Sequence, residues 1–62
     1  MIYHLHLLNR YGRRLDSVEL QYDNDEDAVT DVGWALQGSP AELWRGPVLV
    51  QAFPRVVRQD ER

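Results

Sequence analysis

The stretch DNDEDAVTDVGWALQGSP, residues 23–40, has the pattern of one amphipathic helix with signals at both ends. Asp23 and Glu26 have the spacing of a capping box, and the neighbouring acids fall in the first turn, where the helix dipole favours carboxylates. Gly38 and Pro40 are typical of a helix end. Between these signals, apolar residues recur at helical spacing: Ala28, Val29, Val32, Ala35 and Leu36. The sequence therefore predicts one helix in the middle of the chain.

Two alternating patterns before this helix predict an antiparallel hairpin. Residues 2–8, IYHLHLL, place His4 and His6 on one face of a strand and Tyr3 and Leu5 on the other. Residues 17–22, SVELQY, alternate polar and apolar side chains in the same way. The segment between them, NRYGRR, contains the Asn and Gly that turns prefer. We therefore expect the two strands to pair about this segment.

The segment after the helix predicts a second hairpin. Residues 41–44, AELW, and residues 47–53, PVLVQAF, flank a short Arg45-Gly46 turn. We expect Trp44 to lie opposite Pro47 across this turn. Because proline lacks a backbone N–H, Pro47 is expected at the start of an edge strand.

The element order predicts a single small α+β domain, ββαββ, over residues 1–53, with a polar C-terminal tail over residues 54–62. We expect an antiparallel-rich four-stranded sheet with one helix packed on one face. The helix would cover Tyr3, Leu5, Leu7, Val18, Leu20, Leu43, Val48 and Val50. The opposite face would carry Ile2, His4, His6, Leu8, Trp44, Leu49 and Phe53. One helix cannot cover both faces, and this second face is too apolar to suit contact with water.

Length and composition limit the range of functions. A chain of 62 residues has room for one domain with a thin margin of stability. It has no cysteine, which favours a reducing compartment. It also shows neither an apolar run of about 18 residues nor a signal peptide. These features predict a cytoplasmic protein that is not associated with a membrane.

Charge is unevenly distributed along the chain, although the net charge is only −3. All seven basic residues are arginine, and eight of the ten acidic residues lie between Leu15 and Trp44, where there is no base. This pattern favours head-to-tail self-association, or it is balanced across one small fold. The acidic excess opposes general binding to nucleic acid or to anionic membranes.

His4 and His6 could reach one metal ion, because they share a strand face. Zinc prefers about four ligands, and the chain offers no cysteine and no third histidine, so Glu19 or Glu42 would have to join them. The alternative is a pair of polar aromatic residues on an exposed or interfacial sheet face. We expect this alternative, and therefore no metal or other cofactor.

Motifs for calcium binding and catalysis are incomplete. Asp23, Asp25 and Asp27 recur at the spacing of a calcium-binding loop, but Ala28 stands where that loop needs glycine and Trp34 where it needs glutamate. Helix capping explains the same carboxylates. Two serines and one threonine form no nucleophile motif, and the four glycines are too scattered for a phosphate-binding loop. The sequence therefore predicts a protein that is not an enzyme.

Residues 10–14, RYGRR, form an arginine-rich loop with one tyrosine. Arg10, Arg13 and Arg14 are candidate phosphate contacts, with Tyr11 as a ring for stacking. A solvated hairpin tip explains the same residues without a ligand. The acidic helix suggests the converse role, a segment that mimics nucleic acid and occupies a basic partner.

Trp34 lies about 160° around the helix from the apolar stripe. Tryptophan is a frequent interface anchor, and the core of a monomer does not explain it at this position. The alternative is a ring that folds back over a neighbouring loop. The candidate interface residues are therefore Trp34, Trp44, His4, His6, Leu49 and Phe53.

Three motifs together resemble a family of short, uncharacterised proteobacterial proteins of unknown function and of about this length. The motifs are YHLHLL at residues 3–8, DEDAV at residues 25–29 and ELWRG at residues 42–46, followed by Leu49 and Val50. The resemblance covers residues 2–52 and implies a bacterial, cytoplasmic, stand-alone domain. It implies no activity and no site residues.

The function expected from the residues is a small non-enzymatic protein-interaction domain that forms a homodimer or binds a protein partner. It would bury the second sheet face or the helix face that carries Trp34. The alternative is a nucleic-acid-linked regulator that uses the Arg10–Arg14 loop or the acidic helix. No small-molecule substrate is indicated.

Overall fold

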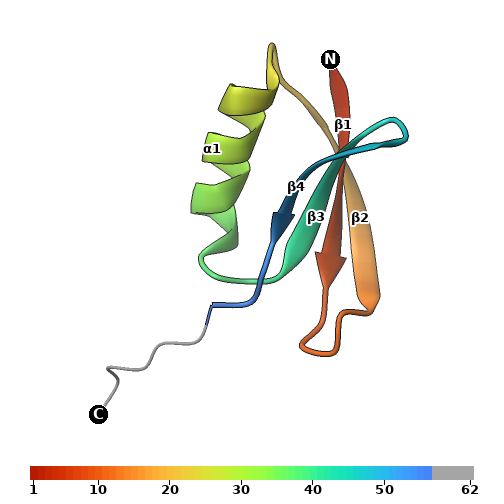
Figure 1. The fold of residues 1–62 in the computed structure, drawn as a ribbon, viewed down its shortest axis with the longest axis vertical. Helices are drawn as coiled ribbons and strands as arrows, with labels where there is room; N and C mark the ends of the chain where they lie inside the picture. The colour runs from red at the N-terminus through yellow and green to blue at the C-terminus, as the bar shows by residue number, and fades with distance from the viewer. Residues whose placement is uncertain (57–62) are drawn as a thin grey trace.

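Four antiparallel strands and one helix make up the fold of residues 1–56, the part of the chain that the computed structural model describes (Figure 1). The elements are β1 (Ile2–Leu8), β2 (Arg14–Gln21), α1 (Asp25–Leu36), β3 (Ala41–Arg45) and β4 (Val48–Phe53). The strand order in the sheet is β2-β1-β3-β4, and every neighbouring pair is antiparallel. The predicted α+β fold with ββαββ order is confirmed. Most of the predicted tail, residues 57–62, lies outside the described residues.

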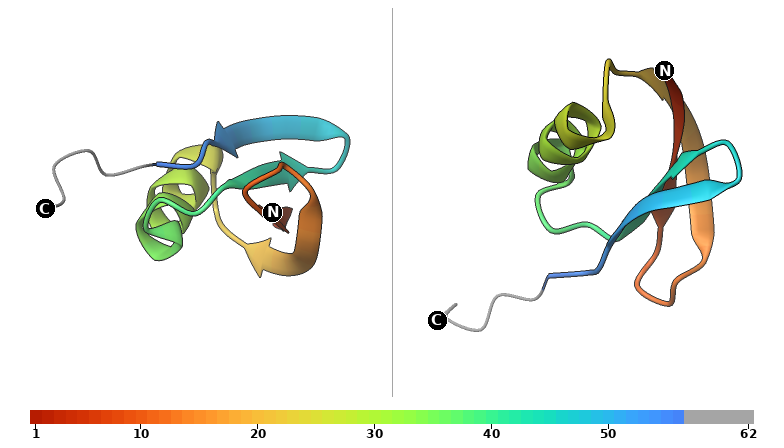
Figure 2. Two further views of the ribbon diagram at one scale, coloured as in Figure 1. Left: turned by 90° about the horizontal axis from the view of Figure 1, so that it is seen from below. Right: turned by 45° about the horizontal axis from the view of Figure 1, so that its top comes forward.

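Helix α1 packs on one face of the sheet and lies beside β4 (Figure 2). The buried core consists of Tyr3 and Leu5 from β1, Ala41 and Leu43 from β3, and Ala28 and Val32 from α1. Val18 and Val48 were expected under the helix but are exposed, because both lie on the edge strands, β2 and β4. Within residues 1–56, no helix has the length and apolar composition needed to cross a membrane.

The register of the second hairpin differs from the prediction. Trp44 pairs with Leu49 and Arg45 with Val48, so the turn is Gly46-Pro47 instead of Arg45-Gly46. The register also shifts between Leu43 and Trp44, which places an extra residue in β4. These two changes bring Phe53 opposite Ala41, on the face covered by α1. The placement of Phe53 on the opposite face was therefore wrong.

The ends of α1 are fixed by local hydrogen bonds. Asn24, rather than the predicted Asp23, is the N-cap, and its Oδ1 accepts a hydrogen bond from the backbone N–H of Asp27 at 2.7 Å. After α1 the chain takes the left-handed conformation at Gln37 and again at Gly38 (φ +87°), which agrees with the helix end predicted at this glycine. The backbone N–H of Val56 donates to the Gly38 carbonyl at 2.9 Å. This bond attaches the chain beyond β4 to the loop that follows α1.

The carboxylate of Asp25 joins the start of α1 to the two central strands. It accepts a hydrogen bond from the hydroxyl of buried Tyr3 at 2.5 Å and pairs with the guanidinium of Arg45 at the end of β3. The guanidinium, followed by the hydroxyl, lowers the pKa of Asp25 below its ordinary value of 3.8. Burial, followed by the hydrogen bond to the carboxylate, raises the pKa of Tyr3. These contacts hold the first turn of α1 over β1 and β3.

Asp25→Asn should make the stability of the fold depend less on pH. Because the folded-state pKa of Asp25 is lowered, the ionised carboxylate stabilises the fold above the ordinary pKa, and this contribution is lost as the pH falls through the lowered pKa. The variant should therefore be less stable than the wild type at neutral pH, and the difference should shrink below about pH 4. Urea unfolding from neutral pH to about pH 2 measures this difference. Asp23→Asn is the control, because no hydrogen bond of the Asp23 side chain is seen in residues 1–56.

Candidate functional site

The face of the sheet that points away from α1, called the open sheet face below, has no covering element within residues 1–56. Tyr3 and Leu5 point toward α1, so His4 and His6 point to the open sheet face. The strand register extends this face in two rows. One row joins Glu19, His4, Trp44 and Leu49, and the other joins Ser17, His6, Glu42 and Ala52. The structure thus brings together four of the six predicted interface residues.

Trp44 lies half-buried near the middle of the open sheet face. Its ring centroid is 6.5 Å from that of His6, and its indole N–H donates to Glu42 Oε1 at 3.1 Å. Leu49, the cross-strand neighbour of Trp44, is 44% exposed. The Nδ1 atom of His6 is covered and has no hydrogen-bond partner in the described part of the chain. Aromatic and apolar side chains grouped on one face favour contact with a protein over contact with water.

The two histidines have carboxylates as cross-strand neighbours. Glu19 pairs with His4, and Glu42 pairs with His6. Among residues 1–56, no group of three or more histidine, aspartate or glutamate side chains is placed to hold a metal ion. The pairing places all four residues on the open sheet face.

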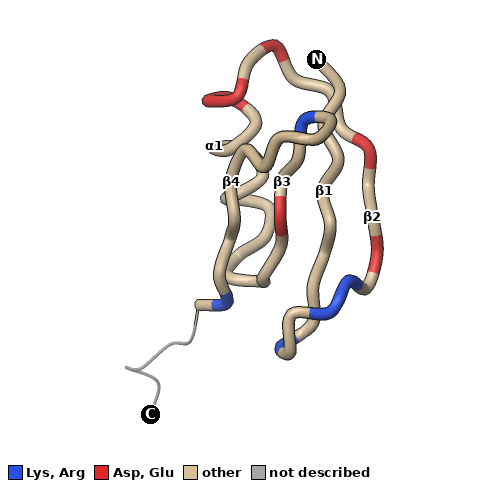
Figure 3. The backbone as a smooth tube through the Cα atoms, turned by 45° about the vertical axis from the view of Figure 1, so that its right-hand side comes forward, with Lys and Arg blue, Asp and Glu red and all other residues tan. Residues whose placement is uncertain are grey.

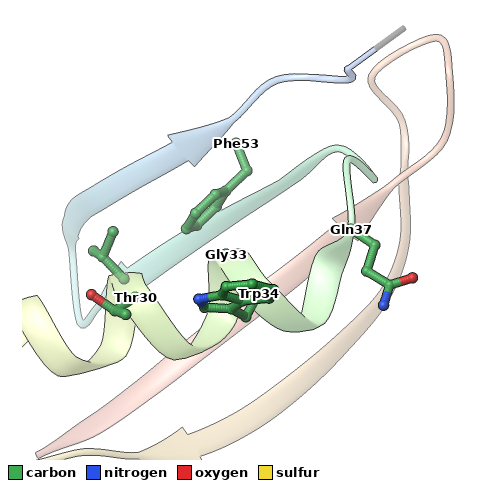
Figure 4. Close-up of a pocket in the computed structure, with 6 residues that line it drawn as sticks. Thr30, Gly33, Trp34, Gln37 and Phe53 are labelled. Carbon is green, nitrogen blue, oxygen red and sulfur yellow. The ribbon is translucent and has the colours of Figure 1, made fainter. Parts of the chain in front are cut away.

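A shallow groove, called the helix groove below, runs between α1 and β4 (Figure 4). Its volume is about 820 Å³, and its lining residues are Val29, Thr30, Gly33, Trp34, Gln37 and Phe53. Trp34 is 80% exposed, so its ring does not fold back over a neighbouring loop. A Cβ atom at Gly33 would lie 3.6 Å from Cε1 of Phe53, an ordinary contact distance, so the phenylalanine ring packs beside Gly33 and forms the floor of the groove. Trp34 and Phe53 therefore belong to this groove and not to the open sheet face.

An acidic depression adjoins the helix groove and shares Thr30 with it. Its other lining residues are Tyr22, Glu26, Asp27 and Asp31. The Tyr22 hydroxyl donates to Asp31 Oδ2 at 2.7 Å, and this hydrogen bond raises the pKa of Tyr22. Among residues 1–56, no basic residue lines the groove or the depression. Together they form one surface that is aromatic on one side and negatively charged on the other.

The turn between β1 and β2, with Arg14 at the start of β2, is called the basic tip below. The side-chain Oδ1 of Asn9 accepts hydrogen bonds from the backbone N–H groups of Tyr11 and Arg13, at 2.8 and 2.9 Å. Gly12 supplies the left-handed conformation that the turn requires (φ +84°). Arg10 lies over the ring of Tyr11, with its Cζ 5.8 Å from the ring centroid. These local contacts give the basic tip a defined shape.

Within the described residues, the arginines of the basic tip form no ion pair. Arg10, Arg13 and Arg14 are exposed, and the one ion pair within residues 1–56 is that of Arg45 with Asp25. Figure 3 shows basic residues at the turn between β1 and β2 and acidic residues at the other end of the molecule, where β2 leads into α1. Acidic residues also lie along β2 and β3 and Arg45 pairs with Asp25, so the separation of charge is between the basic tip and the acidic start of α1. Phosphate binding by these arginines stays a prediction.

The floor of the helix groove was not found from the sequence. The available signal was Gly33 inside a helix, because glycine there is unfavourable and indicates a close neighbour. That neighbour is Phe53, which the predicted register had placed on the other face of the sheet. The groove therefore depends on the shift in register between β3 and β4.

Comparison of the chain with known protein families, with curated proteins and with solved structures found no match. The resemblance to short proteobacterial proteins therefore stays a prediction. The open sheet face, the helix groove and the basic tip are the features from which a function can be inferred.

Proposed function

We propose that this protein is a small non-enzymatic interaction domain that forms a homodimer through the open sheet face. The observation that carries this proposal is the row of Trp44 and Leu49 beside two histidines, on a face that α1 does not cover. Burial of apolar area is the main driving force for association of this kind. Tryptophan at the centre of such a face is the typical residue to supply most of the binding energy.

A second copy of the chain suits this face because the face is complementary to itself. It carries the carboxylates of Glu19 and Glu42 beside the imidazoles of His4 and His6. In a two-fold dimer the same patch meets itself, so that imidazoles of one copy can face carboxylates of the other. Such polar pairs surround the apolar centre, as in other dimer interfaces. The absence of cysteine supports a cytoplasmic location for this dimer.

Sedimentation velocity over a range from about 1 μM to about 1 mM tests the dimer, because this range covers interfaces of ordinary affinity. The expected result is an average mass that rises with concentration from one chain toward two. A mass of one chain throughout the range would contradict the proposal. The variants that locate the interface are argued in the Discussion.

A further inference from the structure

Tyr11 and Trp34 are the two most exposed aromatic side chains within residues 1–56, at 79% and 80%. Tyr11 lies on the basic tip and Trp34 lines the helix groove, so neither belongs to the open sheet face. Packing among the described residues explains neither of them. We propose that the basic tip of one copy binds in the helix groove of a second copy, with the ring of Tyr11 placed against Trp34.

Charge supports this pairing. The basic tip carries Arg10, Arg13 and Arg14 without an ion pair in the described residues. The acidic depression beside the helix groove carries Glu26, Asp27 and Asp31, and no basic residue of the described part of the chain lines it. Opposite charges on the two surfaces steer them together and suppress the two like-charged alternatives, tip to tip and groove to groove.

Each of the two surfaces also carries an exposed aromatic ring. The helix groove is lined by Trp34 and Phe53, whose rings offer an apolar contact for a planar side chain (Figure 4). Tyr11 projects from a tight turn, flanked by arginines on both sides in the sequence. With the ring in the groove, Arg13 and Arg14 would lie toward the acidic depression that shares Thr30 with the groove.

The basic tip needs little reorganisation to bind. Its backbone is fixed by Asn9, which accepts two hydrogen bonds, and by Gly12 in the left-handed conformation. Arg10 already lies over the face of Tyr11. A segment that is ordered before binding loses less conformational entropy in the complex.

The contact joins two different surfaces, whereas the proposed dimer joins a surface to itself. Every copy carries both a basic tip and a helix groove, so association through this contact can continue from one copy to the next. The proposal is independent of the open sheet face. It assigns to Tyr11 and Trp34 a role in association that the dimer through the open sheet face does not require.

The test uses the full chain with Leu49→Glu, which removes association through the open sheet face and separates the two proposals. In nitrogen-15 NMR, the indole N–H signal of Trp34 should shift as the concentration rises from about 20 μM to about 1 mM, a range that covers weak association. The indole signal of Trp44, on the open sheet face, is the internal control and should stay constant. A Trp34 signal that does not change with concentration would overturn the proposal.

Variants of the basic tip show whether the ring of Tyr11 is responsible. Tyr11→Ser should abolish the concentration-dependent shift of Trp34, whereas Tyr11→Phe, which keeps the ring, should retain it. Both variants should fold, because the turn is held by Asn9 and Gly12 and not by the tyrosine side chain. An equal shift in Tyr11→Ser and in Tyr11→Phe would contradict the proposed contact.

A mixing experiment shows that the tip and the groove come from different copies. Labelled Tyr11→Ser has an intact groove, and unlabelled Trp34→Ala has an intact tip. Unlabelled Trp34→Ala should restore the shift of Trp34 in labelled Tyr11→Ser, and unlabelled Tyr11→Ser should not. Restoration by both or by neither would overturn the proposal. Single-stranded DNA provides a further comparison. If it shifts the NMR signals of the basic tip while the Trp34 signal stays constant with protein concentration, the proposal is overturned in favour of nucleic-acid binding by the same arginines.

Discussion

Leu43→Ala should leave a large fraction of the protein unfolded at room temperature. Leu43 is fully buried on β3, where it pairs with Leu5 and packs beneath α1. Removal of a buried leucine side chain costs about 2–5 kcal/mol. A domain of 62 residues has a total stability of only about 3–9 kcal/mol. The loss is expected at the upper end of its range, because a core of six buried residues has few neighbours that can fill the cavity.

Urea unfolding followed by circular dichroism, at one protein concentration, measures this loss. Leu15→Ala is the matched control, because Leu15 is the same residue type on β2 and is 67% exposed. Its stability should differ from that of the wild type by at most about 0.5 kcal/mol. If both variants lost the same stability, the assignment of Leu43 to the core would be wrong.

Leu49→Glu should raise the dissociation constant of the proposed homodimer by about 100-fold or more. Leu49 lies on the open sheet face beside Trp44 and is 44% exposed. A carboxylate at this position would be buried in the dimer without a partner. An uncompensated buried charge costs about 3–5 kcal/mol, and each 1.4 kcal/mol changes the constant about tenfold. At concentrations below about 20 μM, where association between the basic tip and the helix groove is not expected, sedimentation velocity of the variant should therefore show one chain while the wild type is a dimer.

Val48→Glu provides a closely matched control for this substitution. Val48 is the preceding residue on β4 and has almost the same exposure, 48%, but it pairs with Arg45, whose side chain reaches Asp25 on α1. The two residues therefore lie on opposite faces of one strand. Val48→Glu should leave the dissociation constant nearly unchanged. Equal weakening by both variants would indicate a general effect of charge on β4 and would contradict an interface on the open sheet face.

The periodic parts of the fold could be predicted from the sequence. The bounds of β1 agree with the prediction, because alternation over residues 2–8 is regular and a one-residue shift would expose the face that carries Tyr3 and Leu5. The exposure of Trp34 also follows from the 100° spacing of helical residues. Both predictions depend only on which face of an element is apolar.

The groove and its floor could not be predicted in the same way. An extra residue in β4 reverses the alternation between Leu49 and Phe53, and periodicity alone does not reveal such a bulge. The turn was also placed one residue too early, because both Arg45-Gly46 and Gly46-Pro47 contain the glycine that a tight turn needs. The misplaced turn shifts the pairing by two residues and leaves Leu49 on the predicted face, whereas the bulge moves the residues after it to the other face, so Phe53 was assigned to the wrong surface.

Pairing between β1 and β3 determines which step limits the folding rate. Each hairpin joins segments that are close in sequence, and hairpins form within about 1–10 μs. The pairing of β1 with β3 instead brings His4 next to Trp44, which closes a loop containing β2 and α1. The entropy of closing that loop is lost before the contacts of Leu5 with Leu43 form. We therefore expect the pairing of the two hairpins to limit the folding rate, so that substitutions at this junction change the folding rate as well as the stability.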